Sequence, residues 1–253
     1  MWSEYDHYIM AFIAIVGTLV GAAAFLWLAH RSRFAQAVSA CRGLSPPFVN
    51  VVGVLFALTL AFIANDTWLA HDRAIAAVQQ EAGALRTLKV LAQGAPPELC
   101  GVLTTAVEDY ARRVIDEEWP QLVHRQASAA AGASLDALLT LLAGHTTLSP
   151  ALQTALLEQA IEVRRTRDAR LALSQAHVNP LKWLGMGMLG YLTLISIAMV
   201  YGDQIRVELL AVVLFSLAAG PTAAIVLIQA NPVQGPAAIS AAPIAALFLQ
   251  EQS

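Results

Sequence analysis

Four long apolar segments constrain this chain more than any other feature. They lie at residues 8–29, 47–64, 181–201 and 207–230. A helix needs about 20 mostly apolar residues to cross the hydrocarbon core of a bilayer, and each segment comes close to that length or exceeds it. The sequence therefore predicts an all-α polytopic membrane protein with four transmembrane helices, arranged as two hairpins.

The composition supports a membrane protein. Apolar residues make up 57% of the 253 positions and charged residues 13%, whereas soluble domains average about 45–50% and about 25%. The net charge of -3 argues against a basic surface for nucleic acid. Cys41 and Cys100 are the two cysteines, and they predict neither a disulfide framework nor a zinc site. The residues before the first segment are acidic, unlike those of a signal peptide, so we expect a retained span.

A polar region lies between the two hairpins. Within it Ile75, Val78, Ala82 and Leu85 recur with the period of an amphipathic helix. No proline or glycine interrupts residues 65–80, so we expect the second span to continue into water as one helix. The chain divides into a first transmembrane hairpin at 1–64, a helical extramembrane domain at 65–180, a second transmembrane hairpin at 181–230 and an interfacial tail at 231–253.

The tail and the membrane orientation each leave alternatives. Residues 237–249 are apolar but too short to cross, so they either lie at the interface or pack against other helices. Arg31, Arg33 and Arg42 favour a cytoplasmic first loop, whereas the arginines that precede the third span favour a cytoplasmic helical domain. Charge alone therefore leaves the orientation open.

The second span has two contrasting faces. Gly53, Ala57 and Ala61 lie along one side, where small residues allow helices to approach closely in lipid. The opposite side is mostly bulky, with one hydroxyl and a terminal carboxylate: Val51, Leu55, Thr59, Phe62 and Asp66. Such a side is typical of an apolar constriction that gates by dewetting, with a charged mouth. Ordinary helix packing, with the carboxylate at the water boundary, is the alternative.

Three arginines recur at intervals of three residues. Arg164, Arg167 and Arg170 predict either an anion or lipid-headgroup site, or ion pairs with Glu81 and Glu118. A solvated face close to the lipid headgroups is the alternative interpretation.

The sequence has no signature of catalysis. HExxH, GxSxG and phosphate-binding glycine loops are missing, and the six histidines have no metal-ligand spacing. Glu117 and Glu118 precede Trp119 and Pro120 without a nucleophile beside them, and we expect the proline to end a helix there. We predict no enzyme, no metal site and no cofactor.

Several short signatures follow one another along most of the chain. They are Trp68, Ala74 and Glu81-Ala82, then Tyr110 and Glu118-Trp119-Pro120, then the arginine series, Trp183, Asn231-Pro232, Gly235 and Pro243. In this order they resemble the bestrophin-like family of bacterial membrane proteins, and the Glu-Trp-Pro tripeptide downstream of a tyrosine is the most specific part. The tail departs from the family, which tends to read Asp-x-Pro-Phe where this chain has Asn231-Pro232-Val233.

The resemblance implies a function. Bestrophins are pentameric ion channels with four spans and a helical cytosolic region per subunit, and their second span lines a hydrophobic neck. By analogy Leu55, Thr59 and Phe62 are the neck candidates here, and Asp66 is the cytosolic mouth. A ring of these carboxylates would favour cations.

The same resemblance implies the surroundings of the protein. The implied partners are the lipid bilayer, inorganic ions and further copies of the chain in a homo-oligomer, a pentamer as in bestrophins. The implied location is the bacterial inner membrane, with the helical domain in the cytoplasm. The alternative function is a membrane-anchored scaffold or signalling protein, whose helical domain binds a partner and whose second span only packs.

Overall fold

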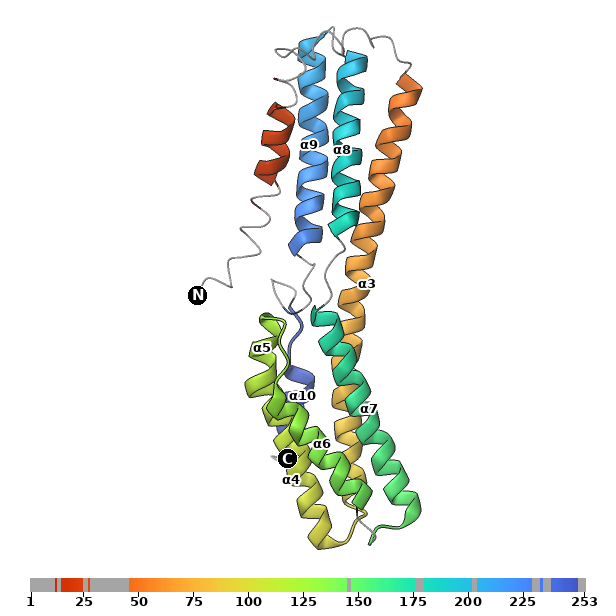
Figure 1. Ribbon diagram of the computed structural model, residues 1–253, viewed down its shortest axis with the longest axis vertical. Coiled ribbons are helices and arrows are strands. Elements are labelled where there is room, and N and C mark those ends of the chain that lie inside the picture. Colours follow the sequence, from red (N-terminus) through yellow and green to blue (C-terminus); the bar gives the residue numbers. More distant parts are fainter. Residues whose placement is uncertain are drawn as a thin grey trace. The chain divides into compact units, whose positions relative to one another are not determined.

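The structure is a computed structural model that describes residues 12, 15–24, 27, 46–144, 147–175, 180–201, 204–228, 233 and 238–249. Every regular element among these residues is a helix, which confirms the all-α prediction. The helices are α3 (Pro46–Ala92), α4 (Pro97–Arg113), the π-helix η1 (Val114–Glu118), α5 (Trp119–Val123), α6 (Ala129–Gly144), α7 (Pro150–Gln175), α8 (Pro180–Tyr201), α9 (Ile205–Ile228) and α10 (Ala242–Leu249) (Figure 1). A further short helix covers Ile15–Ala24.

The chain divides into two compact units. Unit 1 contains residues 1–69 and 177–230, and unit 2 contains residues 70–176 and 231–253. Helix α3 contributes to both units, because it runs through 47 residues without a break. The predicted continuation of the second span as one long helix is therefore confirmed.

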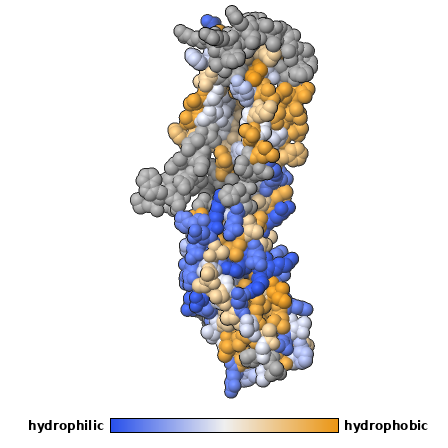
Figure 2. Space-filling view, in the orientation of Figure 1, coloured by the Kyte–Doolittle hydropathy of each residue, from blue (hydrophilic) through white to orange (hydrophobic). Residues whose placement is uncertain are grey.

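The longest apolar helices lie wholly or partly in unit 1. Three helical stretches are long and apolar enough to cross a membrane: Asn50–Ala92, Leu181–Tyr201 and Ile205–Leu227. Of the predicted span at residues 8–29, only 12, 15–24 and 27 lie within the described residues. Apolar side chains cover much of the visible outside of unit 1, whereas hydrophilic ones gather on unit 2 (Figure 2). An outer surface of this kind needs lipid or protein around it.

Packing inside unit 1 joins α3 to α8 and α9. Leu60 and Ile63 of α3 share a buried cluster with Met186 of α8 and Val226 of α9. A Cβ atom on Gly190 of α8 would lie 3.3 Å from Cε2 of Phe56, so a larger residue there would require the Phe56 ring to shift by a few tenths of an ångström.

Unit 2 is a helical bundle with its own core. The predicted amphipathic stripe on α3 is buried here, because Val78, Ala82 and Leu85 join core residues of α4, α6 and α7. Helix α10 contributes Ile244 and Leu247 to the same core. Of the two alternatives for the tail, packing against other helices thus describes residues 242–249.

The prediction that Pro120 ends a helix is wrong. Helix α4 continues through η1 into α5, and Glu118 and Trp119 keep right-handed helical angles. The N–H of Trp119 donates to the carbonyl of Val114, five residues back, so the wider π-turn makes room for the proline ring. Pro120 then occupies the first turn of α5, a position in which proline is tolerated.

Candidate pore face and buried charge cluster

The predicted neck residues lie on the outside of unit 1. Helix α3 buries Leu60 and Ile63 in the unit, whereas Leu55 is about half exposed and Phe62 is 69% exposed. The hydroxyl of Thr59 donates to the carbonyl of Leu55 at 2.8 Å, which leaves its oxygen lone pairs free to face an ion. The bulky side of the span is thus available to a pore axis, a neighbouring subunit or lipid.

Two residues outside the predicted neck, Val54 and Leu58, also lie on the exposed side of α3. A helix turns about 100° per residue, which places Val54 and Leu58 opposite the side that α3 buries. Both are half-exposed. On the circumference of the helix Phe62 lies next to these two residues, whereas Thr59 lies furthest from them. The sequence does not single out these two residues, because the buried side of α3 depends on its packing against α8 and α9.

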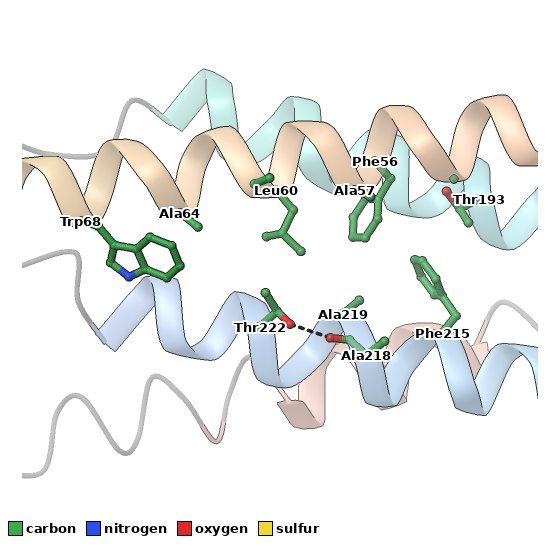
Figure 3. A pocket seen from close by; sticks show the side chains of 12 residues that line it. Phe56, Ala57, Leu60, Ala64, Trp68, Thr193, Phe215, Ala218, Ala219 and Thr222 are labelled. Carbon is green, nitrogen blue, oxygen red and sulfur yellow. Dashed lines mark hydrogen bonds between the residues drawn. The ribbon is translucent and has the colours of Figure 1, made fainter.

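The small-residue side of α3 is open at Gly53. Among the described residues, no atom outside the neighbouring backbone of α3 lies within 4 Å of the position that a Cβ on Gly53 would take. Gly53, Ala57 and Ala61 instead line an open apolar pocket of about 530 Å³, opposite Ala218 and Thr222 of α9 (Figure 3). The Thr222 hydroxyl donates to the Ala218 carbonyl at 2.8 Å, so this polar group is already satisfied within its own helix.

Asp66, the predicted pore mouth, forms an ion pair. The ammonium Nζ of Lys182, in the first turn of α8, lies 2.5 Å from Oδ2 of Asp66. Both side chains are about half exposed. Because 116 residues separate the two positions, the sequence alone does not pair Lys182 with Asp66.

Unit 2 contains a buried group of charged side chains, which we call the charge cluster: Glu81 on α3, Glu118 on η1, and Arg167 and Arg170 on α7. Both glutamates are 0% exposed, and the side chain of Arg170 is 3% exposed. Two carboxylates face two guanidinium groups, so the cluster is balanced in charge. Burying charges is tolerable only when they are paired in this way.

Arg170 links the two carboxylates. Its Nε and Nη2 donate to the two oxygens of Glu81 at 2.8 and 3.1 Å, and Nη2 also donates to Glu118 at 2.8 Å. Arg167 pairs with Glu118 from the other side, with Nε 3.2 Å from both oxygens. Burial opposes the charge on Arg170, but its attraction to Glu81 prevails and raises the Arg170 pKa.

Neighbouring groups complete the charge cluster. The hydroxyl of Tyr110 donates to Glu81 at 2.7 Å, and the backbone N–H of Ser128 donates to Glu118 at 3.3 Å. The guanidinium of Arg170 lies 5.3 Å from the ring centre of Trp119, within cation–π range. Burial, and then the negative charge of Glu81, raises the pKa of Tyr110 well above the ordinary value, so the phenol stays a donor.

The structure brings together four of the five residues of the predicted ion-pair or anion site. Glu81, Glu118, Arg167 and Arg170 meet, whereas Arg164 pairs with Asp136 on the exposed side of α7. The π-helix is part of this arrangement, because it sets the direction of Glu118 after α4. Within the described residues, no group of three or more His, Cys, Asp or Glu side chains is placed to hold a metal ion.

Replacing Tyr110 with phenylalanine removes one donor from Glu81 while Arg170 still pairs with it. We expect a loss of about 1 kcal/mol in the free energy of unfolding at neutral pH, measured by urea titration in detergent. Because the native pKa of Tyr110 is raised, ionisation favours the unfolded chain as pH rises above about 10. The parent should therefore lose stability above that pH faster than the variant, and parallel losses would contradict the assignment.

Comparison with known proteins decides the family. The family model of the Bestrophin-like domain matches residues 16–244. The chain belongs to the bestrophin-like family. The resemblance carried by the Glu-Trp-Pro tripeptide and the arginine series is thereby confirmed, and most residues of the charge cluster come from these signatures. A comparison with curated proteins finds no match.

Solved structures share the fold of this bestrophin-like chain. Two mutant forms of a bacterial bestrophin homologue from Klebsiella pneumoniae align along nearly the whole length. The first is 12% identical with a TM-score of 0.64, and the match covers 97% of this chain and 98% of that one. The second is 11% identical with a TM-score of 0.65, and the match covers 97% of each chain.

Proposed function

We propose that this bestrophin-like protein is an oligomeric ion channel whose pore is lined by α3. The observation that carries the proposal is the outer side of α3, where large apolar side chains stay exposed along a span whose other side packs in unit 1. Membership of a family named for a channel protein supports it. Copies arranged around an axis would bring these side chains together.

The neck we propose is apolar. Leu55, Thr59 and Phe62 were predicted from the sequence, and the packing of α3 adds Val54 and Leu58. Rings of such side chains exclude water when the passage is narrow and admit ions when it widens. Asp66 stands at the mouth beyond them.

The assembly follows the family. We propose a homo-oligomer of five subunits in the bacterial inner membrane, with unit 2 in the cytoplasm. Lipids would cover the apolar surface outside the subunit contacts, and inorganic ions would be the transported species. The function needs no catalytic group and no bound cofactor.

A cysteine scan tests the pore lining. Single cysteines at Val54, Leu55, Leu58, Thr59 and Phe62, in a background without the native cysteines, are reconstituted in liposomes and treated with a charged thiol reagent. We expect each variant to conduct ions. The reagent should block the flux through the Phe62 variant and through one of two pairs of variants, either those at 54 and 58 or those at 55 and 59. A cysteine at Leu184 of α8, which is 69% exposed, is the matched control and should not respond.

The outcome separates the candidate functions. Flux that no cysteine on α3 can block would assign the pore to another element. A folded, oligomeric protein that conducts nothing would contradict the channel and favour the scaffold, whose span only packs.

A further inference from the structure

We infer that Lys182 of α8, through its ion pair with Asp66 of α3, is a determinant of the charge selectivity of the pore. The inference rests on the proposed function. It adds a positive charge, that of Lys182, to the negative charge of Asp66 at the pore mouth. The observation behind it is the distance of 2.5 Å between Nζ of Lys182 and Oδ2 of Asp66, a contact between two span helices within unit 1.

The pair has little structural reason to exist. Both side chains are about half exposed, and exposed ion pairs contribute little to stability because water and salt screen them. Lys182 also lies in the first turn of α8, where the positive end of the helix dipole repels a cation. Its nearest counter-charge is the carboxylate on the neighbouring span. A lysine held in this position changes the potential at the end of the apolar face more than it stabilises the fold.

Electrostatics gives the direction of the effect. A ring of carboxylates attracts cations, and a ring of ammonium groups attracts anions. With one of each per subunit, separated by a hydrogen bond, the two fields nearly cancel at the distance of a passing ion. The parent mouth therefore discriminates weakly between cations and anions. Neutralising Lys182 should therefore leave the negative potential of Asp66 uncancelled, and neutralising Asp66 should leave the positive potential of Lys182 uncancelled.

Reversal potentials under a potassium chloride gradient test the inference. We expect Lys182→Gln to move the reversal potential toward that of potassium, with a several-fold rise in the potassium-to-chloride permeability ratio. Asp66→Asn should move it toward that of chloride, and the double variant should return close to the parent. Lys182→Arg keeps the charge and is the matched control, expected to leave the reversal potential unchanged. Size-exclusion chromatography of each variant shows whether the oligomer is intact.

Two failures are distinguishable. If the parent and the variants conduct and neither single substitution moves the reversal potential, the selectivity role of Lys182 is wrong and the channel stands. If neither the parent nor any variant conducts while the oligomers are intact, the channel and the selectivity role are both wrong.

Discussion

Replacing Arg170 with methionine will destabilise unit 2 by about 3–5 kcal/mol, because it leaves two buried carboxylates without their shared counter-charge. Arg170 donates to both Glu81 and Glu118, and both glutamates are 0% exposed. Arg167 continues to neutralise Glu118, so Glu81 bears most of the loss. Among the described residues, Tyr110 is the donor to Glu81 that then remains. The measurement is the free energy of unfolding from urea titration in detergent, followed by tryptophan fluorescence.

The exposed side of α7 supplies the control. Arg164→Met removes an exposed pair with Asp136 and should change the free energy of unfolding by about 1 kcal/mol or less. Adding Glu81→Gln to the Arg170 variant should recover part of the loss, since it removes the uncompensated charge and keeps an acceptor for Tyr110. Equal effects of the two arginine substitutions would show that the charge cluster does not hold the bundle together.

Truncating Phe62 to alanine will raise the single-channel conductance several-fold. At 69% exposed, Phe62 is the most exposed large side chain on the span portion of α3. In the proposed assembly its removal widens the neck and allows water to wet it, which lowers the barrier to ions. The measurement is the current through single channels in planar bilayers at fixed salt.

Two comparisons make the conductance result specific. Leu184→Ala removes an equally exposed apolar side chain from α8 and should leave the conductance unchanged. Leu58→Ala should act in the same direction as Phe62→Ala if the side of α3 opposite its packing faces the axis. A conductance that responds to Leu184 but not to Phe62 would remove α3 from the pore.

The sequence by itself determined the helices and the family. A bilayer demands runs of about 20 apolar residues, so the described spans could be located by counting. The unbroken α3 followed from the lack of proline and glycine between 65 and 80, and the buried stripe of Val78 and Leu85 followed from the helical period. These features depend on neighbours along the chain, and the order of the short signatures identified the family.

Only the tertiary structure decided which groups meet. The arginine series allowed either ion pairs or a solvated face, and the fold divided it by turning Arg167 and Arg170 inward and Arg164 outward. It also continued the helix past Pro120 and joined Lys182 to Asp66 across 116 residues. Such contacts depend on how helices far apart in the sequence pack and on which side of each is covered. The periodicity of the sequence limits which side chains can share one face of a helix. The packing of whole helices decides which of these faces are buried and which residues pair.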